Sequence, residues 1–89
     1  MFTVTWTPDA LDDLAIAWMS SKPEVRQRIT AATKLIEKHL RATADRLGES
    51  RETDADRVFI VEPLGIEFVV SVPDRMVTVF HAWQVPLDD

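Results

Sequence analysis

The sequence has no cysteine and no apolar run long enough to cross a membrane. The absence of cysteine excludes disulfide bonds and thiolate metal sites, and it fits the reducing cytoplasm. A membrane-spanning helix needs about 20 consecutive apolar residues. Residues 1–6 resemble a strand and not a signal peptide. The sequence therefore predicts a cytoplasmic protein without membrane contact.

Clustered metal ligands, repeats and low-complexity segments are also missing. Without a clustered set of His, Asp or Glu we expect no metal, and nothing in the sequence implies an organic cofactor. The chain has 89 residues, of which 46% are hydrophobic. That length and composition predict a single domain over residues 1–89 with one core.

The charge is unevenly distributed along the chain. The net charge is −5, yet residues 22–41 contain six basic and two acidic side chains, a balance of +4. Residues 42–89 contain four basic and ten acidic side chains, a balance of −6. An acidic protein is a poor general binder of nucleic acid, because neutralising phosphates provides much of that affinity. The basic residues 22–41 are expected to be a solvated helix face, with a local RNA-phosphate patch as the alternative.

Residues 57–83 predict three strands joined by two tight turns. The segment is rich in Val, Ile and Phe, which favour strands. Residues 62–65 and 72–75 supply the turns, because proline presets a turn angle and Gly65 can adopt a positive φ. Two successive hairpins make an antiparallel meander.

The first half of the chain predicts a strand and two helices. Residues 2–6 alternate apolar and polar side chains, as a half-buried strand does. Thr7 is expected to cap a helix that ends before Pro23. Ser21 and Glu24 have the spacing of a capping box for the second helix. The apolar stripe of that helix consists of Val25, Ile29, Ala32, Ile36 and Leu40.

The element order defines the expected fold. Residues 44–56 form a polar loop between the helices and the meander. When each element reverses the direction of the one before it, the last strand is antiparallel to the first and pairs beside it. The prediction is an α+β domain of order β-α-α-β-β-β. Its helical hairpin packs on one face of a four-stranded antiparallel sheet.

Short motifs occur in a recognisable order along the chain. They are Trp6-Thr7-Pro8-Asp9-Ala10 with Leu14, then the LGESRE stretch at 47–52, Arg57-Val58, Pro63-Leu64-Gly65, Val77-Thr78-Val79 and Trp83. This set and the element order resemble the RelE/ParE superfamily of bacterial type II toxins over nearly the whole chain. The chain looks most like a subgroup with a GESR-like loop and a PLG-like turn.

The resemblance implies the toxin of a toxin–antitoxin pair, neutralised by a cognate antitoxin. RelE-like members cut mRNA in the ribosomal A site, and ParE-like members inhibit DNA gyrase. The resemblance therefore implies either a metal-independent endoribonuclease acting at the ribosome or a non-catalytic inhibitor of a protein target. A decayed toxin fold that only binds its antitoxin is the remaining alternative.

Four residues are candidates for ribonuclease chemistry, which needs a base, an acid and cations around the phosphate. Arg57 and Arg51 are the candidate cations, Glu49 is a candidate base, and His81 is a candidate acid. Each has a structural alternative. Arg57 can tie the loop to the sheet, and Glu49 and Arg51 can hold the loop shut. His81 can be an edge-of-core residue that faces the helices together with Trp83.

The chain departs from the ribonuclease pattern at several points. RelE-like nucleases usually present several Lys or Arg from the sheet, and commonly a Tyr near the C-terminus. Here tyrosine is absent, and no lysine follows Arg57. The acidic end at residues 86–89 would repel phosphate. These differences favour the non-catalytic interpretation, whereas the commonest activity of the superfamily that the chain resembles favours the ribonuclease. The endoribonuclease is therefore the first expectation and the non-catalytic binder the alternative.

An apolar patch is expected on the sheet. If Val58 and Ile60 face the helices, then Phe59, Val69 and Phe80 share the opposite face. Contiguous exposed apolar residues mark binding surfaces. We therefore expect this patch to bind an antitoxin segment or a second copy of the chain in a homodimer.

Overall fold

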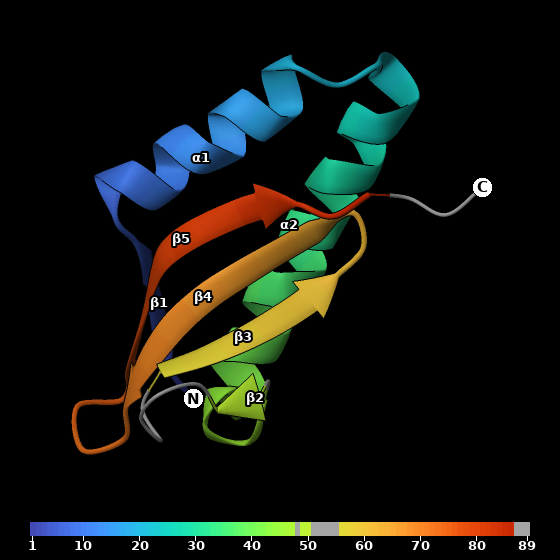
Figure 1. Ribbon diagram of the computed structural model, residues 1–89. Helices are drawn as coiled ribbons and strands as arrows, with labels where there is room; N and C mark the ends of the chain where they lie inside the picture. Colours follow the sequence, from blue (N-terminus) through green and yellow to red (C-terminus); the bar gives the residue numbers. More distant parts are fainter. Residues whose placement is uncertain (48, 51–55, 87–89) are drawn as a thin grey trace.

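The computed structural model describes residues 1–47, 49–50 and 56–86. The elements in chain order are β1 (Thr3–Trp6), α1 (Pro8–Met19), α2 (Pro23–Thr43), the 3-10 helix η1 (Ala44–Arg46), β2 (Glu49–Ser50), β3 (Asp56–Val61), β4 (Leu64–Ser71) and β5 (Met76–Gln84). In Figure 1, α2 crosses behind the sheet and α1 runs along β5. Among the described helices, none has the length and apolar character needed to cross a membrane.

The described strands form one mixed sheet in the order β1-β5-β4-β3-β2. Strands β3, β4 and β5 form the predicted antiparallel meander. Strand β1 lies beside β5, as predicted, but the two are parallel. The α+β class and the helical hairpin packed on the sheet are confirmed. The prediction of an entirely antiparallel sheet is wrong at the β1–β5 pair.

The direction of α1 explains this error. Thr7 N–H, at the start of α1, donates to Val79 O at 2.9 Å, and Ser21 Oγ, beyond its end, bonds to Gln84 Oε1 at 3.3 Å. Helix α1 therefore continues in the direction of β1 and β5 and does not reverse it. The reversal comes in α2, whose end returns to the start of β1, where Phe2 N–H donates to Arg41 O at 2.8 Å.

The start of α1 follows the prediction, and the start of α2 does not. The Thr7 hydroxyl accepts a hydrogen bond from Ala10 N–H at 3.1 Å and caps α1. The N-cap of α2 is Lys22, without a side-chain cap. The predicted capping box is wrong, because Ser21 Oγ donates instead to Ala17 O, 2.7 Å away, in the last turn of α1.

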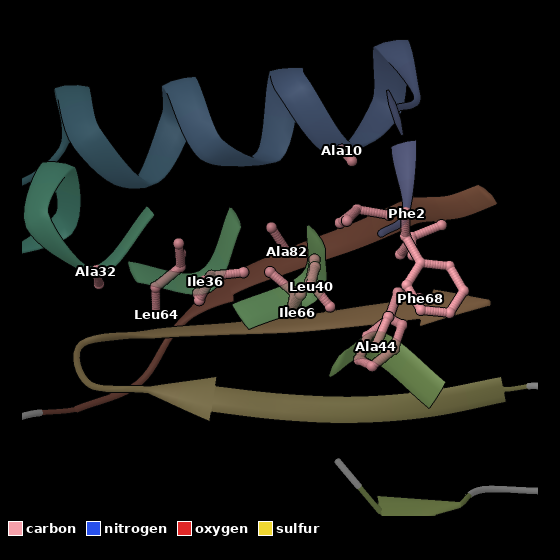
Figure 2. Packing of buried hydrophobic residues seen from close by; sticks show 12 residues of the cluster. Phe2, Ala10, Ala32, Ile36, Leu40, Ala44, Leu64, Ile66, Phe68 and Ala82 are labelled. Carbon is pink, nitrogen blue, oxygen red and sulfur yellow. The ribbon is translucent and has the colours of Figure 1, made fainter. Parts of the chain in front are cut away.

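The core lies between the two helices and one face of the sheet (Figure 2). Four of the five residues of the predicted α2 stripe, Ile29, Ala32, Ile36 and Leu40, are buried, and Val25 is half-buried. Ala10 of α1 meets the same cluster. Phe2, which precedes β1, joins this cluster, and the sheet contributes Leu64, Ile66, Phe68, Val77, Val79 and Ala82.

The polar segment before the meander contains more structure than predicted. It includes η1 and the two-residue strand β2, in which Glu49 pairs with Val58 and Ser50 with Arg57. A two-residue polar strand has no apolar alternation by which it could be predicted from the sequence. Short edge strands of this kind offer few backbone groups for pairing with other chains.

The first hairpin turn is tighter than predicted. Val61 pairs with Leu64, so the turn consists of Glu62 and Pro63, joined by a cis peptide bond. Gly65 lies within β4 opposite Ile60 and is needed for a different reason from the one predicted. A Cβ at this position would lie 2.5 Å from Cε2 of the Trp83 indole. The second turn, at residues 72–75, forms as predicted, with Arg75 N–H donating to Val72 O at 3.1 Å.

A β-bulge at Phe80 changes the alternation of side chains along β5. Odd-numbered residues face the core before the bulge, and even-numbered residues face it after the bulge. Val79 pairs with Phe68 and His81 with Glu67, which leaves Phe80 as an extra residue. Val77 and Val79 therefore face the core before the bulge, and Ala82 faces it after the bulge. His81 and Trp83 lie opposite Glu67 and Gly65, on the sheet face that does not contribute to the core.

Candidate functional site

The sheet face opposite the core, which we call the open face, is the first candidate site. Strand alternation and the observed register assign side chains to it. The members from β3, β4 and β5 are Asp56, Val58, Ile60, Glu67, Val69, Ser71, Met76, Thr78, His81 and Trp83.

His81 is an exposed member of this face and has a defined partner. Its Nδ1 lies 2.9 Å from Oδ2 of Asp13 in α1. A carboxylate can only accept a hydrogen bond, so the proton of this bond belongs to Nδ1 and Nε2 is left for other partners. The imidazole also lies 5.3 Å from the Trp83 ring, centroid to centroid. His81 and Trp83 do not lie on the core-facing side of the sheet, as was predicted, because the bulge at Phe80 shifts the alternation. The predicted contact of His81 with the helices does form, through Asp13 of α1.

Asp13 belongs to this site although it was not predicted from the sequence. The same Oδ2 also accepts the backbone N–H of Ala82 at 3.2 Å, so it joins α1 to β5 by two hydrogen bonds. A signal was present in the sequence. Asp13 follows Ala10 by three residues and precedes Ala17 by four, which places a carboxylate on the buried face of α1.

Arg57 lies on the other side of the sheet. It pairs with Phe68, whose side chain is buried in the core. Its Nη1 donates to Asp45 O at 2.8 Å and to Leu47 O at 3.2 Å. The guanidinium thereby fixes η1 and the following residue to β3, which agrees with the structural alternative for this arginine.

Replacing Arg57 with Met is expected to lower the free energy of unfolding by about 1–3 kcal/mol, because two partly buried carbonyls lose their donor. Urea unfolding of the purified variant measures this loss. Arg46→Met is the matched control, since Arg46 is exposed on η1 and should tolerate the change. Full stability of Arg57→Met would show that the guanidinium has no structural role.

The four predicted ribonuclease residues do not form one described site. Arg57 and His81 project from opposite faces of the sheet, because their pairing partners are Phe68 and Glu67. The backbone of Glu49 pairs with Val58 in β2. The Glu49 side chain and all of Arg51 lie outside the described residues, so their proposed roles stay predictions.

The charge of the open face does not suit a phosphate. Its positions on β3, β4 and β5 include the carboxylates Asp56 and Glu67 and the single imidazole of His81, but no Lys or Arg. Stabilising a phosphorane requires cations or other donors aimed at the developing charge. Among the described positions of this face, no Lys or Arg supplies such a donor.

The predicted apolar patch needs a correction. Phe59 pairs with Ile66 and packs against the core, with its ring 6.1 Å from that of His39 on α2. It is Val58 and Ile60 that face outward, and Ile60 is 50% exposed. Val69 is half-buried on the open face, and Phe80 is the half-buried bulge residue. Partner binding by Val69 and Phe80 stays a prediction.

Metal ligands do not gather in the described part of the chain. Within residues 1–47, 49–50 and 56–86, no three His, Asp or Glu side chains come together in a way that could hold a metal ion.

The fold is that of RelE-like toxins, an α+β arrangement of two helices packed against a mixed sheet. No protein-family model matches the sequence, and no curated protein matches it either. Solved structures match over nearly the full chain. The chromosomal ParDE toxin–antitoxin system of P. aeruginosa superposes with a TM-score of 0.74 at 20% identity, covering 97% of this chain and 98% of that one.

Two further structures extend this comparison. The RelBE2 toxin–antitoxin complex of Mycobacterium tuberculosis has a TM-score of 0.69 at 15% identity, covering 93% of this chain and 96% of that one. The isolated E. coli RelE toxin has a TM-score of 0.65 at 12% identity, covering 100% of this chain and 89% of that one. At these identities the comparisons establish the fold, and they include both ParE-type and RelE-type systems.

Proposed function

We propose that this chain is the toxin of a type II toxin–antitoxin pair, acts in the cytoplasm and is neutralised by a cognate antitoxin. The match of the whole chain to whole chains from the ParDE and RelBE2 systems is the observation that supports the proposal. The motifs of the GESR-like loop and the PLG-like turn, which indicate a subgroup, belong to the same proposal.

The toxin acts by binding a protein target and not by cutting RNA. The described open face presents carboxylates and apolar side chains but no Lys or Arg. Arg57, the strongest candidate for a phosphate clamp, points to the other side of the sheet and holds the carbonyls of Asp45 and Leu47. Among the targets that the resemblance implies, DNA gyrase fits this mode.

The Asp13–His81 pair favours a second candidate, a metal-independent endoribonuclease acting on ribosome-bound mRNA. The carboxylate orients the imidazole and leaves Nε2 available for proton transfer. In this candidate His81 is the catalytic acid or base, Asp13 orients it, and the cations come from Arg51 and its neighbours.

Expressing the chain alone in bacteria is expected to arrest growth, and co-expressing the protein encoded beside it should restore growth. Under the favoured mode the 5′ ends of cellular mRNA remain unchanged while plasmid supercoiling shifts. New mRNA 5′ ends that disappear with His81→Ala and Asp13→Asn would establish the ribonuclease instead. Normal growth at verified expression of folded protein would refute the toxin proposal.

A further inference from the structure

The indole of Trp83 lies flat over the backbone of β4 on the open face. A Cβ on Gly65 would lie 2.5 Å from Cε2 and 2.7 Å from both Cζ2 and Nε1 of this indole. The Cβ direction at Gly65 points outward from the open face, so one face of the ring rests on the glycine. Trp83 is half-buried, and its opposite ring face is turned to the solvent. We call this outer ring face the Trp83 platform.

The side chains around the Trp83 platform are neutral or acidic. Ile60 is 50% exposed and lies on β3 opposite the glycine, and His81 lies 5.3 Å from the indole, centroid to centroid. Glu67 pairs with His81 from β4, and Asp13 contacts the same imidazole from α1. No Lys or Arg occupies a described position of the open face, so these surroundings carry negative charge.

An outward-facing indole in negative surroundings attracts a cation. The face of an aromatic ring is electrically negative, and Trp attracts cations most strongly among the aromatic residues. The guanidinium of arginine suits such a ring better than the ammonium of lysine, because it is planar, stacks on the ring and is more weakly hydrated. The chain itself contains this arrangement at another place, where the Arg26 guanidinium lies 4.5 Å from the Trp18 ring centroid.

The polar groups beside the platform include hydrogen-bond acceptors. Both hydrogen bonds that Asp13 makes with described residues use Oδ2, which leaves Oδ1 as an acceptor. In a neutral imidazole with its proton on Nδ1, the Nε2 atom of His81 is an acceptor as well. A guanidinium has five N–H donors and no acceptor, so its chemistry complements this set. Charge and hydrogen bonding therefore favour the same occupant.

We propose that the Trp83 platform binds an arginine side chain of a protein partner, with the guanidinium stacked on the indole and the carboxylates of Asp13 and Glu67 beside it. The aliphatic stem of that arginine packs on the exposed side chain of Ile60. The inference rests on the proposed function only for the identity of the partner, which is the protein target of the toxin. Arginine binding itself is measured on the purified chain.

The probe is the blocked tripeptide acetyl-Gly-Arg-Gly-amide, titrated into isotope-labelled protein while the indole N–H signals are recorded by NMR. The signal of Trp83 is expected to shift and to saturate, whereas those of Trp6 and Trp18 are internal references and should not move. The same tripeptide with citrulline, which has the shape of arginine without its charge, should bind at least about tenfold more weakly. That ratio corresponds to about 1.4 kcal/mol.

Ile60→Lys should weaken binding of the arginine tripeptide about fivefold, the change that a repulsion of about 1 kcal/mol between neighbouring charges in water produces. Val72→Lys is the matched control. Val72 is 48% exposed, much as Ile60 is, but it follows the end of β4 that is remote from Gly65. It should bind as wild type does. Trp83→Leu should abolish the preference for arginine over citrulline, read from the backbone N–H signals of β4 and β5, and circular dichroism verifies that each variant is folded.

Three results would overturn the inference. They are the lack of a saturable shift at Trp83, equal binding of the citrulline tripeptide, and equal weakening by Ile60→Lys and Val72→Lys. RNA is the competing occupant. If a single-stranded RNA tetranucleotide moves the Trp83 signal and the arginine tripeptide does not, the platform binds a nucleobase and the proposal is wrong.

Growth assays separate this inference from the proposed function. Expression of Ile60→Lys should arrest growth less than expression of wild type, and Val72→Lys should arrest it fully. Equal arrest by both variants would mean that the target does not bind at the platform. Growth arrest without arginine binding would retain the toxin proposal and reject the platform alone. Arginine binding without growth arrest would retain the platform and refute the toxin proposal.

Discussion

Phe68→Ala is expected to lower the free energy of unfolding by about 3–5 kcal/mol, which is a large part of the stability of a domain this small. The Phe68 side chain is fully buried at the centre of β4, between the helices and β5. Removing the ring forfeits its burial and leaves a cavity that the surrounding side chains fill only in part. In a domain of this size each kcal/mol shifts Tm by roughly 4–8 °C, so melting should begin tens of degrees earlier.

Phe80→Ala is the matched control for that experiment. Phe80 is half-buried and is the unpaired residue of the bulge, on the neighbouring strand. Its loss should cost less than half as much, as measured by guanidinium unfolding of both variants. Equal losses would contradict the assignment of Phe68 to the core and of Phe80 to a position outside it.

Gly65→Ala is expected to cost about 1–3 kcal/mol, which is large for the addition of a single methyl group. The new Cβ would lie 2.5 Å from Cε2 and 2.7 Å from Cζ2 of the Trp83 ring, so the indole must leave its place over β4. Chemical denaturation measures the loss, and the tryptophan emission should shift as the ring moves into water.

A double-mutant cycle tests the cause. Trp83→Ala removes the ring that the methyl group meets, so Gly65→Ala should be nearly neutral in the Trp83→Ala background. Additive effects of the two substitutions would mean that Gly65 is needed for its backbone and not for the approach of Trp83.

Most elements of this fold are predictable from local signals. The alternation of residues 2–6, the cap at Thr7, the interruption at Pro23 and the buried stripe of α2 each follow from a few neighbouring residues. Such signals fix where an element begins and which face it buries. They do not fix its direction relative to other elements, which explains why the parallel pairing of β1 with β5 was not predicted.

The prediction of which sheet face each side chain occupies was wrong for two further reasons. Residues 58–61, Val-Phe-Ile-Val, are apolar on both faces, so alternation alone gives no preference between Phe59 and Ile60. The bulge at Phe80 has no signature in the sequence, yet it turns His81 and Trp83 to the open face. The sequence therefore identified His81 as a candidate site residue, but it did not predict that His81 is separated from Arg57 and paired with Asp13.

The double hydrogen bond of Asp13 also bears on the solubility of the molecule. Beyond Trp6, where β1 ends, β5 has no neighbouring strand on that side among the described residues, and α1 covers it. A strand margin left uncovered can pair with foreign strands and start aggregates. By accepting the Ala82 N–H, the Asp13 carboxylate occupies a donor that an incoming strand would need. The contact between Asp13 and Ala82 thus leaves one donor fewer on this margin of β5 for an incoming strand.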